Sequence, residues 1–174
     1  MMPSDTNIAS PAVSSAGQFL QSARKNLAPA LISGLGGMLA ILPLAELTVG
    51  FHYALLIAPF GASCVLLFAL PQSPLARPRN VIGGHFLSSL VGLLMLHFVG
   101  SDVIEMAIGV GLAITVMQLT GTVHPPAGGD PLVVILAGAG WSFLAMPILV
   151  GTSALVVIAL LYHRFLSKRA YPAP

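Results

Sequence analysis

The segment from residue 120 to 131 holds the side chains best suited to chemistry, because it places a histidine and a carboxylate among three prolines and three glycines. His124 can carry a proton near neutral pH or contact a ligand. A histidine at the edge of a membrane span can equally be an interfacial side chain with no role in function. The sequence leaves both roles open.

The backbone of this segment cannot form an unbroken helix. Proline disfavours helical geometry in the preceding residue, so residues 123–125 are predicted to be extended or in a turn, and Gly128 and Gly129 allow unusual backbone angles. Asp130 followed by Pro131 is typical of an N-cap with proline at the first helical position. A short helix is therefore predicted from about Leu132, with free N–H groups suited to a small anion or polar ligand.

A second proline and glycine segment, residues 59–63, is predicted to present a similar helix end, with the Ser63 hydroxyl as donor or acceptor. The substrate-binding residues predicted from both segments are Phe60, Gly61, Ala62, Ser63, His124, Pro125, Pro126, Ala127, Gly128, Gly129 and Asp130. The alternative is that both segments are ordinary turns at a membrane surface.

The loop from residue 71 to 85 brings Arg79, Asn80 and His85 to the predicted cytoplasmic entrance of the third helix. The arginines fit either as anchors on the cytoplasmic side or as an electrostatic funnel for anions. No metal site is predicted, since the five histidines are dispersed, and Ser63 has no nearby His or Asp partner in sequence. We expect no cofactor and no enzymatic activity.

The chain that must position these residues is strongly apolar. It has 174 residues, of which 56% are hydrophobic and only 7% are charged, whereas a soluble domain carries roughly a quarter charged residues. Its mean hydropathy is +0.94. An all-α polytopic membrane protein in the lipid bilayer is predicted, and nucleic acid is not an expected partner because the basic residues form no patch.

Six membrane spans are predicted, at about 28–49, 53–70, 81–100, 103–121, 126–141 and 146–165. They form a transmembrane domain over 28–166, between a disordered cytoplasmic tail at 1–27 and a short cytoplasmic tail at 167–174. An even number of spans places every Lys and Arg on the cytoplasmic side of a cell inner membrane. Four spans remain an alternative if 126–165 supplies only re-entrant segments.

An internal repeat is suggested by a gapless alignment of residues 59–69 with 126–136. Gly36 then corresponds to Gly109, and Gly84 to Gly151. Units of three spans each must be inverted relative to one another, with interrupted middle helices, a recurrent transporter design. The 18 glycines also favour close helix packing and are compatible with a homo-oligomer.

Three motifs together resemble the HPP family of integral membrane proteins, which is named for a histidine and two prolines. They are Phe60-Gly-Ala-Ser63, the stretch from Pro78 to His85 that reads PRNVIGGH, and His124-Pro125-Pro126 followed by Ala-Gly. The resemblance implies about four membrane helices. It also implies a transport role, because members from chloroplasts and cyanobacteria are associated with nitrite.

The function expected from these observations is a transporter or channel for a small inorganic anion such as nitrite. One alternative is a non-transporting sensor or assembly subunit. Another is a transporter of a different small solute with proton coupling, which gains weight if Asp130 faces the pathway, because a carboxylate repels an anion unless it is protonated.

Overall fold

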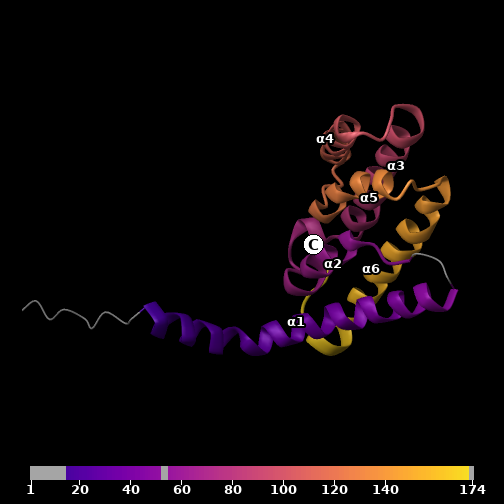
Figure 1. Ribbon diagram of the computed structural model, residues 1–174. Coiled ribbons are helices and arrows are strands. Elements are labelled where there is room, and N and C mark those ends of the chain that lie inside the picture. Colours follow the sequence, from indigo (N-terminus) through magenta and orange to yellow (C-terminus); the bar gives the residue numbers. More distant parts are fainter. Residues whose placement is uncertain (1–14, 52–54, 173–174) are drawn as a thin grey trace, which may run out of the picture.

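The computed structural model describes residues 15–51 and 55–172, and within these ranges it is all-helical. Four helical segments are long and apolar enough to cross a membrane: Gly17–Gly50, Pro78–Phe98, Val103–Thr120 and Trp141–Ser167. The first three correspond to α1 (Ser15–Phe51), α3 (Pro78–Phe98) and α4 (Val103–Thr120), and the fourth includes α6 (Val150–Tyr162). Figure 1 shows these helices around two shorter ones.

The two shorter helices are α2 (Ala58–Cys64) and α5 (Asp130–Leu136). The π-helical segment η1 (Val65–Ala69) continues α2, and the 3₁₀ segment η3 (Pro125–Gly129) precedes α5. Neither unit is long enough to cross ~30 Å of hydrocarbon as a single helix. Six spans were predicted, whereas the described residues form six α-helices of which four are long enough to be candidate spans. The predicted spans at 53–70 and 126–141 correspond to the short helices, and the four long ones match the number that the HPP resemblance implies.

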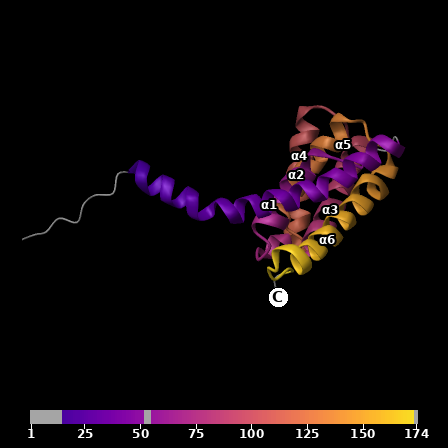
Figure 2. The same cartoon turned by 90° about the horizontal axis from the view of Figure 1, so that it is seen from below.

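Helix α1 begins earlier than predicted. Residues 15–27, expected in a disordered tail, are helical, and residues 1–14 of that predicted tail lie outside the described residues. The N-terminal part of α1 projects away from the bundle in Figures 1 and 2, and its C-terminal part lies along α6. The Tyr162 hydroxyl donates to the Ile32 carbonyl at 2.5 Å and so joins α6 to α1.

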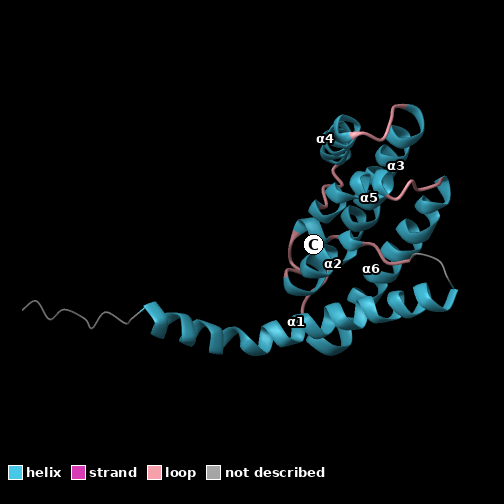
Figure 3. Cartoon of the chain, viewed as in Figure 1, coloured by secondary structure: helices cyan, strands magenta, loops and turns pink. Residues whose placement is uncertain are grey.

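Helix α3 lies at the centre of the fold, where it packs against α4, α5 and α6. Figure 3 shows the loops that connect these helices, including the breaks on either side of α5. The apolar core includes Phe60, Leu67, Phe68 and Leu155, all almost fully buried. The α2–η1 unit therefore contributes Phe60, Leu67 and Phe68 to the core of the bundle.

Two glycines permit close approaches that a side chain would block. A Cβ on Gly84 of α3 would lie 2.8 Å from the Thr122 carbonyl oxygen and 2.8 Å from the His124 Cβ. A Cβ on Gly151 of α6 would overlap the Phe60 ring and lie 3.2 Å from the Leu55 carbonyl oxygen. Each glycine thus sets the spacing between a long helix and the segment leading into a short one.

The C-terminal residues pack against the loop between α2 and α3. The Tyr171 hydroxyl donates to the Ala76 carbonyl at 3.1 Å, and the Gln72 amide donates to the Ala170 carbonyl. The His163 Nε2 donates to the Leu67 carbonyl at 2.8 Å, within the π-helical segment. Ala170 and Tyr171 of the predicted short tail therefore pack on the 70–77 loop, and residues 173–174 of that tail lie outside the described residues.

Candidate functional site

Four polar side chains from separate elements meet in the interior of the bundle. Ser63 lies on α2, His85 on α3, His124 immediately before η3, and Asp130 at the first position of α5. All four have no exposed surface. They come together because η3 and α5 pack against α3, and α2 packs against η3.

The side chains form one continuous hydrogen-bonded chain. The Ser63 Oγ lies 2.9 Å from the His85 Nε2 and 2.9 Å from the His124 Nε2. The other nitrogen of His85, Nδ1, lies 2.8 Å from the Asp130 Oδ2. The order along the chain is therefore Asp130, His85, Ser63 and His124.

Both ends of this chain contact other groups. The His124 Nδ1 lies 2.8 Å from the Leu75 carbonyl oxygen, which can only accept, so Nδ1 carries the hydrogen. The Ser89 hydroxyl donates to the Asp130 Oδ2 at 3.1 Å. The second carboxylate oxygen, Oδ1, is buried and has no hydrogen-bond partner among the described residues. Such an oxygen is costly to leave unpaired in an apolar interior.

Aromatic packing closes the site. The Phe60 ring meets the His85 ring edge to face, with ring centroids 5.3 Å apart. The His85 and His124 rings are 5.1 Å apart and also tilted toward an edge contact. The His85 ring thus lies between the Phe60 ring and the His124 ring.

Residues of α3 fix the segment that carries His124. The Ser88 hydroxyl donates to the Ala127 carbonyl at 2.6 Å, and the Asn80 amide donates to the Val123 carbonyl at 2.9 Å. The Arg79 guanidinium donates to the Thr120 carbonyl at 2.7 Å. Arg79 and Asn80 thus hold the backbone of residues 120–123 in place. The sequence suggested a membrane anchor or an anion funnel for the arginines and did not predict this contact.

The cap predicted for Asp130 is wrong. The N-cap residue of α5 is Gly129, which has ordinary helical angles, and α5 starts at Asp130 itself. No side-chain cap is formed, because the carboxylate turns to His85 and Ser89. Residues 123–125 were predicted to be extended or in a turn; His124 is extended, with φ −135° and ψ 101°, and Pro125 begins the 3₁₀ segment η3.

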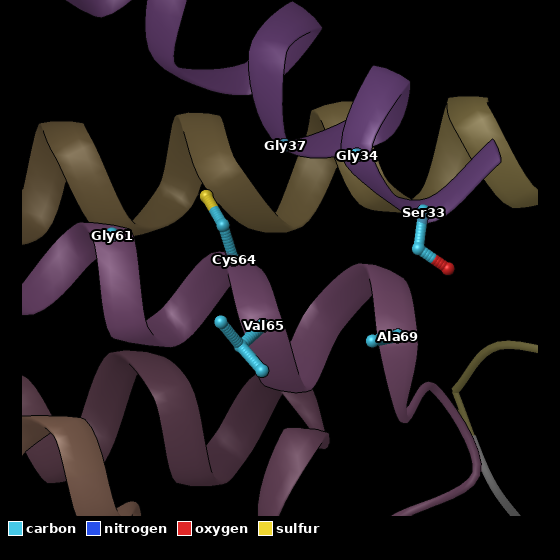
Figure 4. A pocket seen from close by; sticks show the side chains of 7 residues that line it. All are labelled: Ser33, Gly34, Gly37, Gly61, Cys64, Val65 and Ala69. Atoms are coloured by element: carbon cyan, nitrogen blue, oxygen red, sulfur yellow. The ribbon is translucent and has the colours of Figure 1, made fainter. Parts of the chain in front are cut away.

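Several predicted site residues lie away from the cluster. Gly61, Ala62 and Pro125 are exposed, and Pro126, Gly128 and Gly129 are half-buried. Gly61 lines a surface groove of about 280 Å³ between α1 and the α2–η1 unit, shown in Figure 4. The groove is lined by Ser33, Gly34, Gly37, Gly61, Cys64, Val65 and Ala69.

Sequence patterns did not reveal the partners that complete the site. Ser63 has no His or Asp partner nearby in sequence, and the sequence left open whether such partners meet it in space. In the structure His85 and Asp130 align behind it as in a Ser-His-Asp relay. Ser88 and Ser89 were also missed. Their spacing of three and four positions after His85 on one helix was the available signal, because such residues share a face.

The chain matches known proteins along most of its length. The sequence profile described as the HPP transmembrane region matches residues 22–172. One transmembrane protein of Dictyostelium discoideum is 38% identical over 125 residues, which is 67% of this chain and 44% of that protein. Another is 34% identical over 152 residues, 80% of this chain and 49% of that protein.

The chain spans a little under half the length of both relatives, and their names state only that they are transmembrane proteins. No solved structure matches. The three motifs that suggested the family lie within the matched range, and two of them supply the buried histidines. This chain therefore belongs to the HPP family of transmembrane proteins.

Proposed function

We propose that the protein transports a small inorganic anion such as nitrite across the membrane. The observation that carries this proposal is the buried cluster of Ser63, His85, His124 and Asp130 at the meeting point of two short helices. Ionisable residues within a membrane bundle are costly and typically mark substrate or proton pathways. A purely structural bundle gains nothing from a carboxylate with an unpaired buried oxygen.

The proposal includes two inverted units, α1 to α3 and α4 to α6. In such a repeat α1 corresponds to α4, and α3 corresponds to α6. The contacts between the units follow this symmetry, because α1 packs against α6 and α4 packs against α3. The alignment that pairs Pro59 with Pro126 also pairs Gly84 with Gly151. Gly84 approaches the Thr122 carbonyl, and Gly151 approaches the Leu55 carbonyl. The same alignment matches Leu55 with Thr122.

Helix α1 and helix α4 also correspond through Gly36 and Gly109, with a gap of six residues relative to the pairing of Pro59 with Pro126, since the two glycines are 73 positions apart and the two prolines 67. A Cβ on Gly36 of α1 would overlap the Phe68 ring, and one on Gly109 of α4 would lie 3.9 Å from Ile135. Phe68 and Ile135 are aligned positions in the two short units. Ser63 and Asp130 are aligned positions as well, so the proposed symmetry places one cluster residue from each unit on opposite sides of His85.

The cluster is closed to solvent, so transport by this site requires movement. The inverted units supply a physical basis for it, because rocking one unit against the other opens a central site alternately to either side. The interface that must move includes α3 against α4, α5 and α6, and α1 against α6.

The proposal further places the protein in an inner membrane with both termini cytoplasmic, following the side preference of Lys and Arg. Docking of the C-terminal tail on the 70–77 loop supports a common side for Lys168 and Arg77.

The test is uptake of labelled nitrite by proteoliposomes that contain the purified protein, compared with His124→Ala. We expect saturable uptake that His124→Ala abolishes. His163→Ala is the matched control, since His163 is also buried but contacts Leu67 and Ser167 outside the cluster. Uptake no higher than in empty liposomes, from inserted wild-type protein, would reject nitrite, and equal loss in both variants would indicate a structural role.

One observation favours an enzyme as the second candidate. Ser63, His85 and Asp130 have the distances of a serine hydrolase relay. However, the Ser63 Oγ is fully buried and is also held by His124, whereas a nucleophile needs an open face. Covalent labelling of Ser63 by a fluorophosphonate, absent from Ser63→Ala, would establish this alternative; an unlabelled wild-type protein would exclude it.

A further inference from the structure

We propose that the chain Asp130, His85, Ser63 and His124 is a binding site for one exchangeable proton, held by the Asp130 carboxylate or by one of the two histidine rings. As a proton site it stands on the hydrogen bonds alone. Its role as the coupling ion of transport rests on the proposed function.

His124 has a fixed hydrogen position. Its Nδ1 must donate to the Leu75 carbonyl, 2.8 Å away. A neutral imidazole carries only one hydrogen, so the Nε2 of a neutral His124 is a bare acceptor. That bare nitrogen lies 2.9 Å from the Ser63 Oγ.

His85 is constrained in the same way. An ionised Asp130 can only accept, so the His85 Nδ1 donates to it across 2.8 Å. The Nε2 of a neutral His85 is then also a bare acceptor, 2.9 Å from the Ser63 Oγ. The single hydroxyl hydrogen of Ser63 cannot serve two bare nitrogens. With Asp130 ionised and both histidines neutral, one short contact has no hydrogen.

One added proton removes this conflict. Four contacts join Asp130, His85, Ser63, His124 and the Leu75 carbonyl, and the added proton places one hydrogen in each. The added proton can make Asp130 a carboxylic acid with both rings neutral, or make His85 an imidazolium beside the carboxylate. It can also make His124 an imidazolium, with Ser63 then donating to the His85 Nε2. All three forms have a net charge of zero, which suits a fully buried site.

A second proton is disfavoured by charge. The Pro59 carbonyl, 3.2 Å from the Ser63 Oγ, can accept the hydroxyl hydrogen and let both histidines donate to Ser63. The cluster would then carry a buried net positive charge. Among the described residues, the elements packed around it offer no further carboxylate within the site: α2 adds only Cys64, and Glu105 of α4 lies beside Gly100.

Proton uptake thus changes the cluster from a net charge of −1 to 0, with the proton taken from water on one side of the membrane. Release to water on the other side restores the first state. The unpaired Asp130 Oδ1 and the His124 contact with the 70–77 loop mark the two ends of the chain. Because the protonated cluster is neutral, an anion can approach it without repulsion, so anion and proton are expected to move together.

The first test detects the proton directly in the full-length protein reconstituted in lipid. Infrared difference spectra and ¹⁵N-histidine NMR at neutral pH should show a carboxylic acid band or an imidazolium signal. Raising the pH should remove one proton from the site. Asp130→Asn should fold and lose that titration, because the Asn amide can donate to the His85 Nδ1 and fill every contact without an added proton.

The same spectra contain the result that would overturn the proposal. Spectra at neutral pH with an ionised Asp130 and two neutral rings would show that the site holds no proton. A titration that persists in Asp130→Asn would place the proton elsewhere.

The second test separates the proton site from the proposed transport. In proteoliposomes, an imposed pH gradient should raise nitrite uptake by wild-type protein at least several-fold. The gradient should not change whatever uptake Asp130→Asn retains. If the spectra show the proton but no nitrite flux is measured, the proton site stands and nitrite transport is rejected. Nitrite flux that is independent of the gradient would keep the transporter and reject the proton as its coupling ion.

Discussion

The Ser63 Oγ and the His124 Nε2 lie 2.9 Å apart although the two residues are separated by 61 positions in the chain. This contact joins the end of one short helix to the turn that precedes the other. It also places the serine of one motif against the histidine that gives the family its name. The cluster thus combines side chains from two motifs, and neither motif can form it without the other.

Ser63→Ala should reduce nitrite uptake at least about tenfold, because it removes the only hydroxyl between His85 and His124. Uptake into proteoliposomes measures the effect, with protein yield as the check on insertion. Thr152→Ala is the matched control, since the buried Thr152 hydroxyl donates only within its own helix, to Ile148 and Leu149. Normal uptake by Ser63→Ala would show that the relay is not used.

Gly84→Ala should destabilise the fold by about 1–3 kcal/mol, the usual effect of overpacking. The new Cβ would lie 2.8 Å from the Thr122 carbonyl oxygen, a backbone atom that cannot rotate away. Thermal unfolding in detergent measures the change. Gly61→Ala is the control at an exposed helical glycine, where an added Cβ would meet no neighbouring group within 4 Å, so an equal loss in both variants would contradict the steric explanation.

Ser88→Ala should lower stability by about 1–3 kcal/mol, because the Ala127 carbonyl loses the donor that lies 2.6 Å away in the interior. Unfolding midpoints in detergent report this loss. Ser88→Thr keeps a hydroxyl and is expected to restore much of the stability. If Ser88→Ala unfolded like the wild type, the hydrogen bond would not contribute to holding the turn after His124.

Single cysteines at Pro74 and Lys168 should react with a membrane-impermeant maleimide from the same side, and one at Ser101 from the opposite side. The tail is docked on the 70–77 loop, whereas α3 separates this loop from residue 101. The background is Cys64→Ala, which removes the buried free thiol. In intact cells, labelling of Lys168→Cys from outside would reverse the proposed orientation.

The sequence by itself determined the class of the protein and the location of its breaks. Few charges and long apolar runs require helices in a bilayer, since lipid cannot satisfy backbone N–H and C=O groups. Prolines 59, 125, 126 and 131 mark where helices begin, because their local geometric effects do not depend on distant residues. The number of spans does not follow in the same way, since an apolar run of a given length fits a crossing or a short buried helix equally well.

Tertiary structure alone decided what the polar residues do. His85 was predicted at a cytoplasmic entrance and Asp130 as a helix cap, yet they are hydrogen-bonded to each other at 2.8 Å. Local sequence favours a cap for a residue of this type, but burial against α3 offers the carboxylate a histidine and a serine instead. Partners 22, 45 and 61 positions apart are chosen by the packing of whole helices, so spacing along the chain could not reveal them.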